Sequence, residues 1–179
     1  AMASQRLAGH GMSICYQYGI FKQQFVDGRQ EELPDDWLGM GDVWLITKED
    51  EAEEIHFGGT LEEYWDSNGN LRVLHKDYTT VIGIPRDMLI TGYDSNVINT
   101  LRLWSSTSPV TIDMKLFAQG KYLESMHEKH MAEVISKILY PEDAHIEGKR
   151  LRLKQQYFFI AASLQCLTRR HMKRFGTLD

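Results

Sequence analysis

The sequence predicts an α/β protein, more closely a mixed α+β segment, in which a largely antiparallel β region precedes two long helices. Turn signals at Asp27-Gly28 and Asn68-Gly69 separate runs of β-forming residues in the first half. Apolar residues recur at helical spacing in the second half. The length of 179 residues, 42% of them hydrophobic, suits one domain. We expect a single partial domain over residues 1–179, with a β-rich part at 1–92, a connecting loop region at 93–121 and a helical part at 122–179.

The β-rich part contains alternating runs between turns. Asp27-Gly28 predicts a tight hairpin turn within residues 25–30, since both residues tolerate a positive φ. A second hairpin is predicted around Asn68-Gly69, because apolar residues alternate along both arms. Proline lacks a backbone N–H, so Pro85 is expected to end the strand before it. The predicted strands cover residues 13–18, 61–66, 71–76 and 79–84.

Two amphipathic helices are predicted in the C-terminal part. The first covers residues 122–140 and is ended by Pro141. The second runs from Leu151 to about Met172, and its last turn is rich in cations, which complement the negative end of a helix dipole. Gly176 suits the stop that follows.

Composition and charge narrow the classes of partner. The net charge of −5 argues against nucleic acid, because phosphate contacts require an excess of Lys and Arg. No apolar run approaches the roughly 20 residues of a membrane span. Cys15 and Cys166 lie far apart and form no CxxC motif, so the default expectation is a reducing, cytoplasmic location.

Motifs that carry chemistry are few. His127 and His130 are three residues apart rather than four, and no third ligand is identifiable, so we expect no metal site. They fit a polar helix surface or a subunit contact. The basic cluster from Arg169 to Arg174 fits either an anion site or the charge bias of a helix end. Taken alone, these patterns indicate a soluble α/β domain without a defined activity.

Four segments, in order along the chain, resemble the glycogen/starch/maltodextrin phosphorylase family. Residues 16–23 resemble the family's RYxYGxFxQ, and residues 32–38 resemble the DDWL or DNWL that follows it. Residues 92–105 resemble GYxNxxVNTLRLWSA, and residues 138–158 resemble LYPxDxxxEGKxLRLKQxYF. The resemblance covers nearly all of this chain but only about a fifth of a family member.

The resemblance implies a segment of the Rossmann-like N-terminal domain of a two-domain glycosyltransferase. Family members cleave a terminal α-1,4-glucosyl unit with inorganic phosphate and release glucose 1-phosphate. Their pyridoxal phosphate is held on a lysine of the C-terminal domain, which has no counterpart here. Their phosphate-binding glycine-rich loop and sugar-pocket residues would flank this chain. The resemblance therefore implies a fragment that binds no cofactor and has no phosphorolytic activity alone.

The resemblance also implies roles for particular residues. The loop 141–148 matches the loop that gates the catalytic cleft, with Asp143, Ala144 and His145 at its centre. Ala144 stands where many members have an asparagine, and its side chain cannot donate a hydrogen bond. The predicted helix 122–140 matches a tower helix that packs across a two-fold dimer, through Tyr122, Met126, His127, His130 and Met131. Arg169 and Arg170 match an arginine pair that contributes to effector-phosphate binding in animal enzymes.

Three functional readings remain open. The chain is an inert catalytic-domain fragment, a module that binds glucan or dimerises through the tower helix, or a phosphate-binding regulatory piece built on Arg169 and Arg170. Four Trp and eight Tyr provide rings that stack on sugars or fill a core. Exposed strand edges and apolar patches of an excised segment invite self-association. We therefore expect a homodimer or a higher oligomer.

Overall fold

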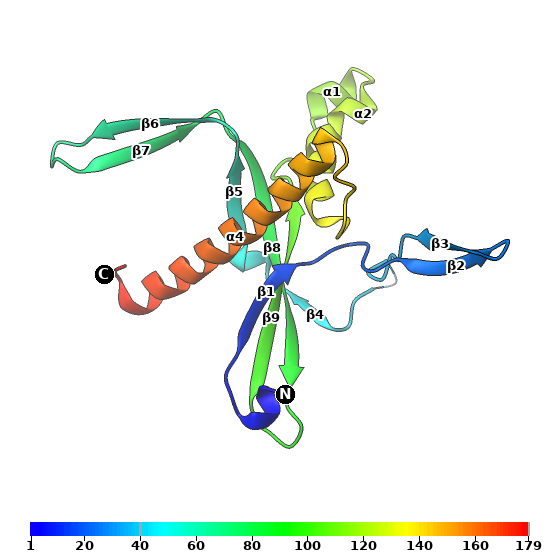
Figure 1. Ribbon diagram of the computed structural model, residues 1–179. Coiled ribbons are helices and arrows are strands. Elements are labelled where there is room, and N and C mark those ends of the chain that lie inside the picture. Colours follow the sequence, from blue (N-terminus) through cyan, green and yellow to red (C-terminus); the bar gives the residue numbers. More distant parts are fainter. Residues whose placement is uncertain (40, 179) are drawn as a thin grey trace.

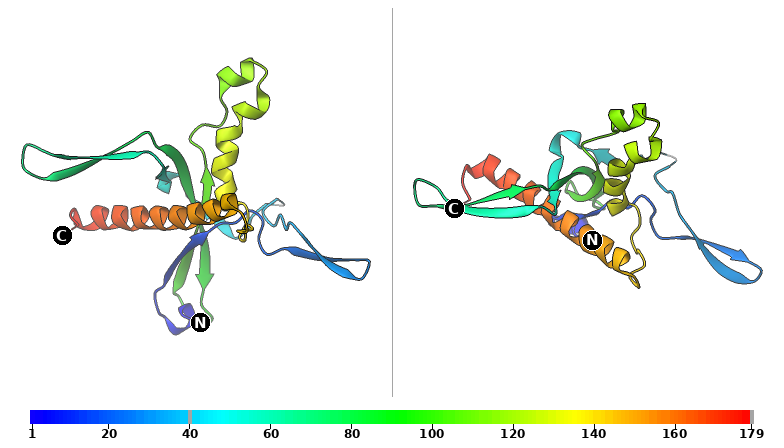
Figure 2. Two further views of the ribbon diagram at one scale, coloured as in Figure 1. Left: turned by 45° about the horizontal axis from the view of Figure 1, so that its top comes forward. Right: turned by 90° about the horizontal axis from the view of Figure 1, so that it is seen from above.

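A computed structural model describes residues 1–39 and 41–178. A sheet forms the centre, the long helix α4 lies across it, and two hairpins and a small helical group project outward (Figures 1 and 2). The strands are β1 (His10–Ile14), β2 (Lys22–Val26), β3 (Arg29–Leu33), β4 (Leu45–Thr47), β5 (Glu53–Phe57), β6 (Thr60–Trp65), β7 (Leu71–Lys76), β8 (Thr79–Thr91) and β9 (Ile98–Thr107). The helices are η1 (Ala3–Gln5), η2 (Glu49–Glu51), α1 (Met114–Ala118), α2 (Tyr122–Ser125), α3 (His127–Glu133), η3 (Val134–Ser136) and α4 (Ile146–Phe175).

The central sheet has five strands in the order β1-β9-β8-β4, and β5 also pairs with β8. Strand β1 runs parallel to β9, with Ile14 opposite Trp104, whereas β8 pairs antiparallel with β9, β4 and β5. The predicted mixed α+β class with a largely antiparallel β region is therefore confirmed. The first strand lies earlier than the predicted residues 13–18, because β1 covers His10–Ile14.

The prediction that Pro85 ends a strand is wrong, because β8 continues through it from Thr79 to Thr91. Along one edge of β8, the β5 ladder ends at Gly83 and the β4 ladder begins at Arg86. Pro85 occupies the gap between them, and its carbonyl accepts a hydrogen bond from the Lys48 amide at 2.9 Å. In an antiparallel strand the N–H and C=O of one residue point to the same side. The missing N–H of Pro85 therefore faces a position where no ladder partner requires it.

The core lies between one face of the sheet and α4. Alternate residues of β8 and β9 are buried, among them Val81 and Trp104. Phe158 and Ala162 of α4 are also fully buried and pack against this face. Gly83 lies so close to both that a Cβ there would contact them at 3.4 and 3.5 Å. The predicted second helix is confirmed and extended, and it stops at Gly176, whose φ of 75° is left-handed.

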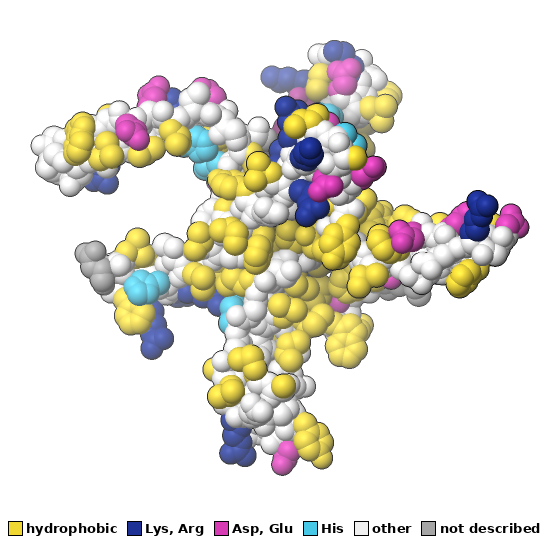
Figure 3. Space-filling model, viewed as in Figure 1, with side chains coloured by type: hydrophobic (Ala, Val, Ile, Leu, Met, Phe, Trp, Pro, Cys, Tyr) yellow, Lys and Arg dark blue, Asp and Glu magenta, His cyan; other side chains and the backbone are white. Residues whose placement is uncertain are grey.

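Both predicted hairpins are confirmed, and both project away from the core (Figure 1). Gly28 and Gly69 take the positive φ that their turns require. Yellow side chains gather along one side of the β6–β7 hairpin (Figure 3), and Trp65 is 70% exposed there. Six ladder pairs form this hairpin, and among the described residues it is a sheet of two strands only. Such a ribbon is at most marginally stable by itself, which points to a covering surface outside this chain.

Two parts of the expected organisation differ from the structure. The single helix predicted over 122–140 is instead broken into α2, α3 and η3, with a break at Met126, where φ is −107° and ψ is 0°. The Ser125 hydroxyl donates to the Tyr122 carbonyl at 2.7 Å and closes α2 locally. The region 93–121, expected as a connecting loop, contains the central strand β9 and helix α1.

The accessible surface of the chain is unusually large for its mass. It amounts to 13127 Å² for 20.7 kDa. A compact monomer of that mass exposes about 8,900 Å². The difference comes from the projecting elements and the uncovered sheet face, which are surfaces suited to burial in a larger body. Within the described residues, no helix combines the length and the apolar character needed to cross a bilayer.

Candidate functional site

The segment that joins η3 to α4 carries the residues matched to a gating loop. Helix α4 begins at Ile146, so the last three residues of the predicted loop 141–148 belong to its first turn. His145 is the N-cap, and its Nδ1 accepts a hydrogen bond from the Gly148 amide at 3.1 Å. The Asp143 carboxylate accepts a hydrogen bond from Arg152 at 2.8 Å. Ala144 is exposed, and its methyl group can neither donate nor accept a hydrogen bond.

The same segment is held at both ends by backbone contacts. The Gln155 amide donates to the carbonyls of Ile135 and Ile138 at 3.1 and 2.8 Å. The Gly148 Cα lies so close to the Glu142 carbonyl that a Cβ on it would overlap that oxygen. Asp143 and Ala144 therefore sit at the tip of a short segment whose two flanks are fixed on α4.

Two hollows include Leu139 and Tyr140 of this segment in their linings. One of about 240 Å³ includes Tyr16, Tyr140 and Arg152 in its lining. The other, of about 380 Å³, is lined mainly by apolar groups, among them Phe21 and Leu139. Burial raises the pKa of Tyr16, so its hydroxyl stays protonated near neutral pH and can donate a hydrogen bond. These surfaces can hold a ring or a hydroxylated ligand, but they present no nucleophile beside a base.

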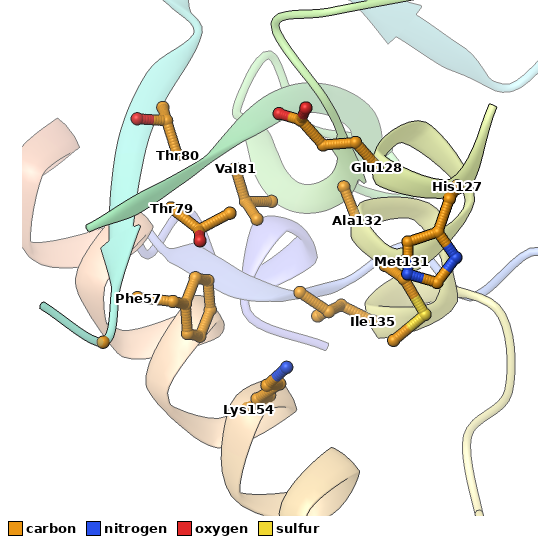
Figure 4. A pocket seen from close by; sticks show the side chains of 11 residues that line it. Phe57, Thr79, Thr80, Val81, His127, Glu128, Met131, Ala132, Ile135 and Lys154 are labelled. Carbon is orange, nitrogen blue, oxygen red and sulfur yellow. The ribbon is translucent and has the colours of Figure 1, made fainter. Parts of the chain in front are cut away.

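Some of the residues matched to a dimer contact are exposed to solvent, and others line a hollow. Tyr122 and Met126 are exposed on α2 and at the break after it. His127 and Met131 line a hollow of about 500 Å³ with Phe57 and Lys154 (Figure 4). His130 is also exposed and does not line that hollow. Across residues 1–39 and 41–178, no group of three or more His, Cys, Asp or Glu side chains is arranged to hold a metal ion.

A buried arginine on β9 joins the central sheet to η2 and α4. Arg102 is 1% exposed and forms two hydrogen bonds of 2.8 Å with the Asp87 carboxylate across the β8–β9 ladder. Its remaining nitrogen lies 2.6 Å from Glu51 and donates to Cys166 at 3.2 Å. Burial alone would lower the pKa of Arg102, but the hydrogen bonds with Asp87 and Glu51 outweigh it and raise that pKa. The guanidinium is therefore a permanent charge at the junction of sheet, η2 and α4.

Arg169 and Arg170 lie beside this junction on α4. Arg169 bonds the Glu53 carboxylate and donates to the Glu51 carbonyl at 2.8 Å. Arg170 lies 3.6 Å from the Glu51 carboxylate and 3.3 Å from His10 Nε2. Burial, followed by the charge of Arg170, lowers the pKa of His10 and favours its neutral form. The hydrogen bond from Arg102 lowers the pKa of Glu51 against the opposing effect of burial.

The sequence patterns identified the arginine pair but missed Arg102, Asp87, Glu51 and Glu53 as its neighbours. Runs of acidic residues such as 49–54 are usually solvated, yet Glu53 is buried. One available signal was Arg102 itself, which shares the buried face of an otherwise alternating strand with Trp104. An arginine at such a position requires carboxylate partners.

The comparisons identify the class of protein. The family description Carbohydrate phosphorylase matches residues 1–179. The chain therefore belongs to the carbohydrate phosphorylase family.

Individual relatives agree with this assignment. The chain is 42% identical over 180 residues to a protein named glycogen phosphorylase, brain form, from Mus musculus. It is 40% identical to a glycogen phosphorylase of Synechocystis sp. and 39% identical to one of Bacillus subtilis, each over 179 residues. All of this chain is covered in each case, but only 21% of each relative. The chain thus corresponds to a segment of these enzymes and spans about a fifth of their length.

Proposed function

We propose that this chain is a segment of an α-glucan phosphorylase and that it has no phosphorolytic activity alone. The whole enzyme would transfer a terminal α-1,4-linked glucosyl unit to inorganic phosphate and release glucose 1-phosphate in the cytoplasm. The family match over residues 1–179 carries this proposal. The large accessible surface supports it, because the chain exposes faces that a larger enzyme would cover.

In the whole enzyme, the segment around Asp143, Ala144 and His145 would lie at the mouth of the catalytic cleft. Its tip is free to meet substrate, while its flanks are fixed on α4 by Gln155 and Gly148. Asp143 would contribute a carboxylate that accepts hydrogen bonds from sugar hydroxyls once it leaves Arg152. Ala144 leaves the neighbouring position without a donor. Specificity at this edge would therefore depend on Asp143 and on backbone groups.

The cofactor of the family, pyridoxal phosphate, would supply a phosphate group as proton donor and acceptor in the whole enzyme. A lysine that holds such a cofactor as a Schiff base needs an enclosed environment. Every lysine in the described part of the chain is exposed or half-buried. We therefore propose that another part of the enzyme holds the group.

An activity measurement tests the proposal. The purified chain, incubated with maltodextrin and inorganic phosphate with and without pyridoxal phosphate, is expected to form no glucose 1-phosphate above the blank. The assay would couple glucose 1-phosphate to NADPH formation, with an intact glycogen phosphorylase as the positive control. Product that rises with the amount of chain, and that co-purifies with it, would contradict the inactivity of the segment.

An alternative proposal is a non-catalytic module that binds glucan or dimerises. The exposure of Met126 and Met131 on neighbouring helices favours the dimerisation form, because exposed methionines suit adaptable contacts. These residues lie on a broken helical segment rather than on one long helix, so any isologous contact would be short.

Replacing Met126 and Met131 together by serine is expected to weaken self-association by about tenfold, since apolar anchors dominate small interfaces. Light scattering after size-exclusion chromatography at several concentrations gives the dimer fraction. Leu61 and Val73, which are even more exposed on the β6–β7 hairpin, provide the control pair when both are changed to serine. If both double variants lose self-association equally, or if the methionine double variant loses none, α2 and α3 are ruled out as the dimer contact.

A further inference from the structure

Two residues of the acidic segment 49–53, Glu51 and Glu53, lie against the arginines of α4 and β9. Helix η2 covers Glu49–Glu51, and β5 begins at Glu53. The side chains of Glu51 and Glu53 point to the three guanidinium groups, whereas Glu49 and Asp50 form no ion pair with those arginines within the described residues. One short segment therefore connects the sheet to the C-terminal half of α4.

The charges in this cluster are balanced. Three arginines, Arg102, Arg169 and Arg170, face three carboxylates, Asp87, Glu51 and Glu53. The Cys166 thiol and His10 also contact the cluster, and burial together with Arg170 lowers the pKa of His10 and favours its neutral form. The arginines therefore carry little uncompensated positive charge toward an external anion.

One terminal nitrogen of Arg169, Nη2, is also occupied. This nitrogen bonds the Glu53 carboxylate and the Glu51 carbonyl, and it lies 3.5 Å from the Ala52 carbonyl. The Glu53 side chain is 10% exposed, so its carboxylate is shielded from water and held against the guanidinium. A buried carboxylate in contact with an arginine competes directly with any phosphate oxygen for the same N–H groups.

We propose that Glu51 and Glu53 act as an internal ligand that closes the arginine cluster to external anions. The acidic segment takes the place that an oxyanion would occupy and fixes α4 to the sheet. Removal of the Glu53 charge frees the Nη2 group of Arg169 from its carboxylate partner and leaves the cluster with a net positive charge. The cluster then becomes a site for a compact oxyanion such as pyrophosphate.

Isothermal titration with inorganic pyrophosphate tests this closure. The unmodified chain is expected to bind no more tightly than an Arg169→Ala/Arg170→Ala variant. Glu53→Gln is expected to bind about tenfold more tightly or better, since a competing charge-assisted contact is removed. Adding Arg169→Ala to Glu53→Gln is expected to abolish the gain.

Asp50→Asn provides the matched control. It changes the net charge by the same amount in the same segment, at a side chain that forms no ion pair with the three arginines. Equal gains from Asp50→Asn and Glu53→Gln would overturn the proposal, because general electrostatics would then explain them. Arginine-dependent binding in the unmodified chain would overturn it as well, and this result does not depend on how well the Glu53 variant folds.

Discussion

Replacing Arg102 by methionine is expected to lower the free energy of unfolding by about 3–5 kcal/mol. Arg102 is almost completely buried, and the Asp87 side chain, which accepts two of its hydrogen bonds, is 11% exposed. Methionine fills much of the same volume but leaves the Asp87 carboxylate buried without its cation. The loss of an ion-pair partner in a buried site costs more than the intact pair contributes. Urea titration followed by circular dichroism measures the change.

Two further variants separate the buried charge from other effects. Lys76→Met breaks the exposed Lys76–Glu62 pair and is expected to change stability by less than about 1 kcal/mol. Combining Arg102→Met with Asp87→Leu removes both charges and is expected to recover much of the loss. A cost below about 1 kcal/mol for Arg102→Met alone would show that the cluster does not stabilise the junction.

The parts of the fold that depend on local signals were predictable from the sequence. Asp27-Gly28 and Asn68-Gly69 fix their hairpins because the turn chemistry lies within four residues. The second long helix was predictable because its apolar spacing continues without interruption. The continuation of β8 through Pro85 was not predictable, because the effect of the missing N–H depends on which neighbouring strand faces it.

The first predicted long helix could not be predicted correctly from its local pattern. Apolar residues over 122–140 follow a helical period, yet the chain breaks at Met126 and tightens at Val134. The Ser106 and Ser136 hydroxyls lie 2.9 Å apart, and each accepts a hydrogen bond from the backbone N–H of the other residue. This buried contact ties η3 to β9 across 30 residues, and no periodic pattern records it.

Family resemblance identifies the residues of the candidate site. How these residues are held in place depends on contacts between positions that the motif does not link. The motif over residues 138–158 is sufficient to single out Asp143 and its neighbours. The contact of Asp143 with Arg152, and of Glu142 with Gly148, joins residues that are six to nine positions apart through a turn. The sequence contains these residues but not the close approach that makes a glycine necessary at 148.

Gly148→Ala is expected to destabilise the chain by about 3 kcal/mol, although it places a better helix former in the first turn of α4. A Cβ at Gly148 overlaps the Glu142 carbonyl, and this obstacle is backbone rather than a flexible side-chain end. The segment carrying Asp143 and Ala144 must therefore move away from α4, which also strains the His145 cap. Thermal unfolding measures the stability loss, and limited proteolysis after Glu142 with a glutamate-specific protease reports the opening of the segment.

The sign of this effect decides between two physical causes. Helix propensity alone predicts that Gly148→Ala stabilises the chain by up to about 1 kcal/mol. Lys149→Ala, at the exposed next position of the same turn, is a substitution by alanine without the overlap and is expected to change stability little. A stabilised Gly148→Ala would show that the segment adjusts freely. A loss of stability in Gly148→Ala but not in Lys149→Ala, with faster cleavage, means that the close approach at Gly148 holds the Asp143 segment in place. A gate at this position must then move as a unit with the first turn of α4.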